Sequence, residues 1–216
     1  NRLVFPAEDH LIASSDDRIY YLEKMGDQWI PIDSVSINND LLFQYERDTL
    51  IATSAIGSKR RNLDIYTTTT GTIDYQFDIT VPEEIQSVCM GNSQCFIGYF
   101  EAVVNNIPVV GAVEVYDKST VPWSLVQTIT PPATPYLHDR FGASVLLKED
   151  ILYIGSTQGG VMGPSNLGSG SVYMYENVGG NWQLLTTIDS PISDESKRFG
   201  HRIDSYDEYI IVGSDM

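Results

Sequence analysis

Among the side chains of this sequence that could take part in a reaction, carboxylates in neighbouring pairs are the most frequent. They occur at Glu8-Asp9, Asp16-Asp17, Glu83-Glu84 and Asp194-Glu195. A glycosidase needs two carboxyl groups roughly 5–9.5 Å apart on either side of its substrate. Residues that are adjacent in a turn seldom converge in this way, and acidic side chains are common in turns because they hydrogen-bond to their own backbone. We therefore interpret these pairs as solvated turns.

The other residues with reactive side chains form no recognisable motif. The three histidines, His10, His138 and His201, lack the spacing of a zinc site. Ser144 and Ser171 lie in strand-like stretches, without the sharp strand-to-helix turn that presents a catalytic serine. The sequence therefore predicts no catalytic residue and no enzyme.

The charge of the chain limits its partners. The 216 residues include 29 acidic and 13 basic ones, which gives a formal net charge of −16. Binding to nucleic acid or to anionic lipid depends on clustered Lys and Arg, so the composition argues against both. The acidity is typical of a β-rich protein that must stay soluble. No run of 18 apolar residues occurs, so we expect no membrane span in this segment.

The only two cysteines, Cys89 and Cys95, flank what we read as the tip of a hairpin. Residues opposed across two strands can satisfy the Cα separation of about 4.4–6.8 Å that a disulfide needs. Small core-facing side chains are the alternative interpretation. The pattern leaves both interpretations open.

Two short motifs recur at a fixed interval. Arg140-Phe141-Gly142 returns as Arg198-Phe199-Gly200, and Gly155-Ser156 returns as Gly213-Ser214, each 58 residues later. Between them the apolar residues alternate, and turn residues recur every 8 to 12 positions or so, which indicates strands and no helix. A period of this size that contains several short strands is typical of a β-propeller, a radial array of small sheets.

Weaker copies of the unit extend to the start of the chain. Each unit has a first strand, a tight polar turn, an apolar second strand, an aromatic third strand and a fourth strand. The second strands end at Ser14, Thr53, Gly98, Gly155 and Gly213. We predict an all-β propeller of four-stranded antiparallel blades at 1–36, 37–82, 83–131 and 132–190, with half a fifth blade at 191–216.

Four blades and a half cannot close a ring by themselves, and an open array leaves unpaired strand edges. The chain begins at Asn1 without a signal peptide, as a mature or trimmed segment would. We expect it to be part of a propeller of five to seven blades. The completing blades would come from missing sequence or from another chain.

The Phe-Gly opening, the Gly-Ser ending of the second strand and the Gly170–Tyr175 strand together resemble the FG-GAP repeat. This repeat is the blade unit of integrin α-subunit heads. Two units depart from it, with Asn39-Asp40 and Glu84-Ile85 in place of Phe-Gly. The kelch repeat is a weaker match, because it lacks the Phe-Gly opening and expects Gly-Gly where this chain has Gly-Ser.

The resemblance implies an extracellular or cell-surface module that binds protein or glycan in adhesion or assembly. Several FG-GAP blades bind calcium through an Asp-x-Asp-x-Asp-Gly loop between their first two strands. The corresponding turns here, such as Lys148-Glu149-Asp150, lack the alternating carboxylates that calcium prefers. We therefore expect no cofactor. A carbohydrate-active propeller enzyme with a central-channel site and a kelch-like intracellular adaptor are the alternative functions.

The resemblance also implies that the fourth-to-first and second-to-third loops share one face. Loops on a rigid scaffold often carry recognition, so this face is our predicted binding face. Its candidate partner-binding residues are Tyr136, Asp139, Arg140, Met162, Asn166, Asp194 and Arg198.

Overall fold

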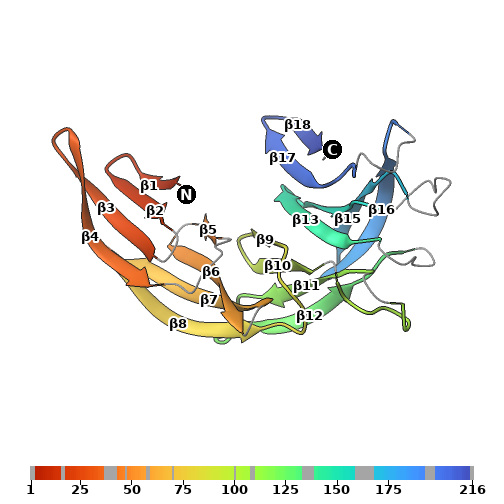
Figure 1. Ribbon diagram of the computed structural model, residues 1–216, viewed down its shortest axis with the longest axis horizontal. Helices are drawn as coiled ribbons and strands as arrows, with labels where there is room; N and C mark the ends of the chain where they lie inside the picture. Colours follow the sequence, from red (N-terminus) through yellow and green to blue (C-terminus); the bar gives the residue numbers. More distant parts are fainter. Residues whose placement is uncertain are drawn as a thin grey trace. The chain divides into compact units, whose positions relative to one another are not determined.

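The structure is a computed structural model that describes residues 3–15, 18–36, 43–46, 48–56, 59–69, 71–99, 101–107, 110–132, 139–158, 168–192 and 198–214. The chain divides into two compact units, Asn1–Pro82 and Glu83–Met216, and each is described by itself. Both units are built from antiparallel strands (Figure 1). None of the described residues belongs to a helix long and apolar enough to cross a bilayer.

The first unit contains two four-stranded sheets, in which the strands pair in chain order. Blade 1 consists of β1 (Leu3–Ala7), β2 (His10–Ser14), β3 (Arg18–Met25) and β4 (Gln28–Ser36). Blade 2 consists of β5 (Phe43–Glu46), β6 (Thr49–Ile56), β7 (Lys59–Thr69) and β8 (Thr72–Thr80). The facing sides of the two blades share one apolar core, formed chiefly by Ile12, Ile19 and Tyr21 of blade 1 and by Leu50, Ala52 and Tyr66 of blade 2.

The second unit contains two further four-stranded sheets and one hairpin. Blade 3 consists of β9 (Ser87–Met90), β10 (Gln94–Tyr99), β11 (Ala112–Asp117) and β12 (Ser124–Ile129). Blade 4 consists of β13 (Phe141–Lys148), β14 (Ile151–Ser156), β15 (Ser171–Val178) and β16 (Asn181–Asp189). Half blade 5 is the pair β17 (Arg202–Tyr206) and β18 (Tyr209–Gly213). The predicted architecture of four antiparallel blades and half a fifth is confirmed.

Alternating side chains build the core between blades 3 and 4. Phe96, Val113 and Val115 of blade 3 pack in one core with Leu152 and Ile154 of blade 4. All five side chains are fully buried. Successive strand residues point to opposite faces of a sheet, so the apolar residues of each strand divide between two blade junctions.

The two cysteines lie on opposite faces of blade 3. In the register of β9 and β10, Cys89 pairs with Phe96, whereas Cys95 pairs with Met90. A shift of one residue between the two pairs turns the side chains to opposite sides of the sheet. Both cysteines are buried thiols, so the disulfide interpretation is wrong and the interpretation as small core-facing side chains is confirmed. The Cys89 Sγ instead accepts a hydrogen bond from the Leu147 backbone N–H of blade 4 at 3.1 Å.

The repeated Phe-Gly motif forms a turn that locks one blade onto the preceding one. In the turn Arg140–Ala143, the Ala143 N–H donates to the Arg140 carbonyl, and Gly142 has a φ of 86°. A positive φ at this turn position favours glycine. The Gly142 carbonyl accepts a hydrogen bond from the Ser87 hydroxyl of blade 3 at 2.8 Å.

The same lock recurs one blade later. The Gly200 carbonyl accepts a hydrogen bond from the Ser144 hydroxyl at 2.7 Å. The Phe141 N–H donates to the Val110 carbonyl at 2.8 Å, and the Phe199 N–H donates to the Ser169 carbonyl at 3.0 Å. We call this arrangement the Phe-Gly lock. Its recurrence explains why the motif repeats at a fixed interval.

The lock requires a residue without a side chain at the end of the preceding second strand. A Cβ atom at Gly98 would overlap the Gly142 carbonyl oxygen, and one at Gly155 would overlap the Gly200 carbonyl oxygen. Gly213 is the equivalent residue of half blade 5, and there the nearest atoms to an added Cβ are 3.6 Å away.

This difference gives a matched pair of variants. We expect Gly155→Ala to lower the free energy of unfolding by about 1–3 kcal/mol, because the new methyl group overpacks the lock. We expect Gly213→Ala to change it by no more than about 0.5 kcal/mol, since the added methyl group makes only ordinary van der Waals contact there. Urea unfolding of both variants measures the effect, and equal losses would contradict the role of the lock.

Buried tyrosines predict a loss of stability at alkaline pH. Burial, together with the negative charges of Asp139 and Asp189, raises the pKa of Tyr173 to about 12. Below about pH 10 this tyrosine is neutral in both the folded and the unfolded state. Between about pH 10 and 12 only the unfolded chain loses the proton, so the free energy of unfolding falls as the pH rises.

We therefore expect Tyr173→Phe to lose less stability than the wild-type chain over that pH interval. Urea unfolding at a series of pH values from about 9 to 12 provides the measurement. A pH dependence identical in the two proteins would show that Tyr173 ionises equally in both states.

Candidate functional site

Only three of the predicted partner-binding residues are described. Tyr136, Met162, Asn166 and Asp194 lie outside the described residues. Asp139 and Arg140 lie at the junction of blades 3 and 4, whereas Arg198 lies at the junction of blade 4 and half blade 5. The three residues thus occupy two separate junctions. Their contact with a partner stays a prediction.

At each junction the backbone of these residues takes part in the Phe-Gly lock. Asp139 is 7% exposed, and its carbonyl accepts a hydrogen bond from the Ser156 hydroxyl at 2.7 Å. Arg140 and Arg198 each begin a lock turn, with positive φ values of 54° and 48°. The residue before each Phe-Gly pair thus has the same backbone conformation at both junctions.

A groove of about 230 Å³ lies away from the Phe-Gly locks, beside the turns that join first strands to second strands. We call it the turn groove. It is formed within the second unit by the β9–β10 turn of blade 3, the β13–β14 turn of blade 4 and the β15–β16 hairpin. Its lining residues are Gly91, Asn92, Ser93, Gln94, Leu147, Glu149, Asp150, Asn177 and Trp182.

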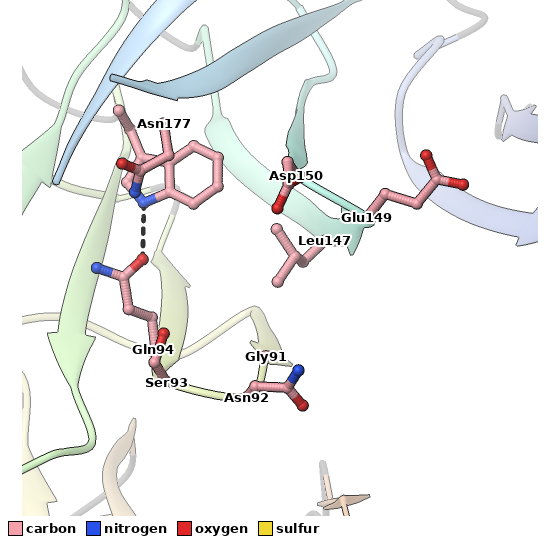
Figure 2. A pocket seen from close by; sticks show the side chains of 9 residues that line it. Gly91, Asn92, Ser93, Gln94, Leu147, Glu149, Asp150 and Asn177 are labelled. Atoms are coloured by element: carbon pink, nitrogen blue, oxygen red, sulfur yellow. Dashed lines mark hydrogen bonds between the residues drawn. The ribbon is translucent and has the colours of Figure 1, made fainter. Parts of the chain in front are cut away.

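Trp182 is fixed at the base of the turn groove. Its ring packs edge-on against Phe96 of blade 3, with 5.4 Å between the ring centroids. Its indole N–H donates to the Gln94 side-chain oxygen at 3.0 Å, the bond drawn in Figure 2. The Gln127 side chain bonds both the N–H and the carbonyl of Trp182, at 2.8 and 2.9 Å. Three residues of blade 3 thus hold one residue of blade 4.

The rim of the groove is polar and acidic. The Asp150 side chain lies beside Leu147 and faces the groove, whereas the Glu149 side chain extends away from it (Figure 2). Asn92 and Ser93 line the blade 3 side, and Asn177 lines the far side. Glu149 has a positive φ of 54°, which belongs to the tight two-residue turn that presents both carboxylates.

Two lysines next to lining residues donate to backbone carbonyls. Lys118 donates to the Gly91 carbonyl at 3.0 Å, and its ammonium lies 5.5 Å from the centre of the Trp123 ring. Lys148 donates to the carbonyl oxygens of Asp207 and Tyr209 in half blade 5. No Lys or Arg is among the residues that line the groove. The arrangement can hold a cation that also has an apolar stem.

Sequence reasoning assigned Glu149 and Asp150 to a turn, which is correct, and placed Gln94 in a hairpin tip, whereas Gln94 is the first residue of β10. It missed that the two turns adjoin, because no spacing in the sequence links neighbouring blades at this level. Aligning the first turn of one repeat with the first turn of the next would have indicated that these turns are neighbours. No group of three or more His, Cys, Asp or Glu side chains that could hold a metal ion occurs within the described ranges.

The comparisons with known proteins identify the fold. No protein family and no curated protein matches the chain by sequence. Among solved structures, the N-terminal domain of Nup159 matches with a TM-score of 0.53 at 12% identity, over 85% of this chain and 47% of that one. The WD40 domain of Toxoplasma gondii coronin matches with a TM-score of 0.57 at 14% identity, over 92% and 47%.

A third similar structure carries the name of an enzyme. It is a Bacteroides uniformis protein named after 6-phosphogluconolactonase, with a TM-score of 0.57 at 13% identity, over 87% of this chain and 54% of that one. The chain therefore spans about half the length of these structures. Its fold is that of a partial β-propeller. The identities are too low to carry more than the fold.

The base of the turn groove can be tested directly. We expect Gln94→Leu to lower the free energy of unfolding by about 1–3 kcal/mol, because the buried indole N–H of Trp182 loses its acceptor. Urea unfolding gives the loss of stability. Ser93→Ala is the control, since it removes a hydroxyl from the same turn but leaves the Gln94–Trp182 bond in place. A similar loss in both variants would contradict the assignment.

Proposed function

We propose that this chain is a non-enzymatic interaction module that binds a protein partner, with the turn groove receiving a basic side chain of that partner. The observation that carries the proposal is the placement of the Asp150 carboxylate beside the apolar Leu147, in a groove that the fixed Trp182 also lines. A Lys or Arg side chain has an apolar stem and a charged end, and this groove offers a complementary surface to each part.

A peptide side chain fits the groove better than a sugar ring. Sugars stack on exposed faces of aromatic rings, whereas Trp182 is 6% exposed and packs its ring against Phe96. The amide and hydroxyl groups of Asn92, Ser93 and Asn177 around the groove can bond to the backbone of a partner. Protein is therefore the partner that we favour over glycan.

The fold and the resemblance support the wider assignment. In a solved structure, S. cerevisiae Dbp5 is bound to Nup159, which supports protein binding by this architecture. The FG-GAP resemblance of the Arg140–Gly142 and Gly155–Ser156 motifs supports an extracellular or cell-surface location and a part in adhesion or assembly. We include both in the proposal.

The test uses two small probes and the ¹⁵N-labelled 216-residue chain. N-acetyl-lysine amide carries the cationic side chain, and N-acetyl-norleucine amide is its neutral counterpart. We expect saturable NMR shifts of the Asn92, Ser93 and Asp150 amides with the lysine probe only. The carboxylate attracts the ammonium group, and added salt should weaken the binding.

Two variants separate the groove from the general negative charge. We expect Asp150→Asn to weaken binding of the lysine probe at least threefold. Glu149→Gln removes the same charge from the adjacent residue, whose side chain extends away from the groove, and should have a smaller effect. Equal losses in the two variants, or shifts spread over the whole acidic surface, would refute the proposed site.

A further inference from the structure

The thiol of Cys89 connects blade 3 to a residue that lines the turn groove. Cys89 lies on β9 and is 4% exposed, and its Sγ accepts the hydrogen bond from the Leu147 backbone N–H. Leu147 lies on β13 and is a lining residue of the groove, whereas Cys89 is not. A buried residue outside the groove is therefore bonded directly to its wall.

The sulfur takes the place of a strand partner for Leu147. In the described part of the chain, the first strand β13 forms a ladder with β14 alone, in which Leu147 pairs with Leu152. The Leu147 N–H is directed to Cys89 instead. An N–H that is shielded from water and lacks an acceptor costs free energy. The thiol thus holds the backbone of Leu147 at a point where no strand does.

A second residue of the same segment bounds the side chain of Leu147. A Cβ atom added at Gly91 would overlap the Leu147 Cδ2 atom, so this side chain lies directly against the Gly91 backbone. The turn that contains Gly91 is closed by its N–H, which donates to the Gln94 carbonyl at 2.8 Å. Cys89 and Gly91, two residues apart, therefore fix both the main chain and the side chain of Leu147.

Leu147 is the part of the groove that an apolar stem can contact. It supplies the only aliphatic side chain among the described residues that line the groove, and Trp182 is 6% exposed and offers little surface. The Leu147 side chain lies next to the Asp150 carboxylate (Figure 2). A cation held by Asp150 extends its stem past Leu147, and a longer stem removes more apolar surface from water.

We propose that Cys89 is a positioning residue of the turn groove. Its hold on Leu147 makes the groove prefer a cationic side chain with a long apolar stem, such as lysine, to one with a short stem. This inference rests on the proposed function, because only a groove that binds a cation can have such a preference.

Two probes of equal charge measure the preference. N-acetyl-lysine amide carries its ammonium group on a long stem, and N-acetyl-2,4-diaminobutyric acid amide carries the same group on a shorter one. We expect the ¹⁵N-labelled wild-type chain to bind the lysine probe at least threefold more tightly, because the longer stem covers more of Leu147. NMR titration of the Asn92 and Asp150 amides at neutral pH gives both affinities.

Three variants test the role of the thiol. Cys89→Ala removes the acceptor and should lower the preference for the lysine probe to less than about 1.5-fold. Cys89→Ser keeps an acceptor and should retain the wild-type preference. Cys95→Ala is the matched control, because it removes the same atoms from a fully buried position on the opposite face of blade 3. The short probe should bind all three variants within twofold of wild type, which shows that the groove is intact.

The Leu147 amide gives a second readout that needs no ligand. Its hydrogen exchange should be at least tenfold faster in Cys89→Ala than in Cys89→Ser, because only the serine hydroxyl can accept its hydrogen bond. In Cys95→Ala the exchange of this amide should stay within threefold of wild type.

The outcomes separate this inference from the proposed function. Equal binding of the two probes to the wild-type chain would overturn the inference alone. An unchanged preference or unchanged Leu147 exchange in Cys89→Ala would do the same, and so would equal losses of preference in Cys89→Ala and Cys95→Ala. Failure of the wild-type chain to bind either probe would refute the proposed function and this inference with it.

Discussion

The close approach of one blade's Phe-Gly turn to the second strand of the preceding blade is the constraint on which the second unit depends. Two backbone segments meet there without a side chain between them, at Gly98 against Gly142 and at Gly155 against Gly200. The serine hydroxyl of the first strand then reaches the turn carbonyl at both junctions. A buried carbonyl without a partner would be costly, so serine, glycine and the Phe-Gly turn are required together.

The lock fixes the distance between blades, and the rest of the junction follows from that distance. Phe96 and Trp182 can pack edge-on, and Gln127 can bond to the Trp182 backbone, only if the two sheets are held at one spacing. The turn groove is what remains at the end of this junction where the β9–β10 and β13–β14 turns diverge. The position of Trp182 in the groove is therefore held in part by residues that lie outside it, which suits a preorganised binding site.

The sequence predicted the repeating elements well because their residues act locally. Alternating apolar residues, two-residue acidic turns and glycines at a fixed interval each determine a strand, a turn or a blade junction without reference to distant parts of the chain. It could not decide between a disulfide and two core-facing thiols at Cys89 and Cys95, because a shift of one residue in strand register decides which face each thiol takes. It also could not find the contact between Gln94 and Trp182, which joins two blades through side chains that no periodicity singles out.

The same logic explains why half blade 5 retains the features of a complete blade. Phe199-Gly200 makes its lock with blade 4, and Gly213 keeps the small residue that a following Phe-Gly turn would require, although an added Cβ there would meet only Arg202, at 3.6 Å. Ile210 and Val212 continue the alternation that buries Leu152 and Ile154 in blade 4. A strand that had become a permanent outer edge would be expected to carry a bulge, a proline or a charge. β18 thus has the composition of an inner strand of a blade.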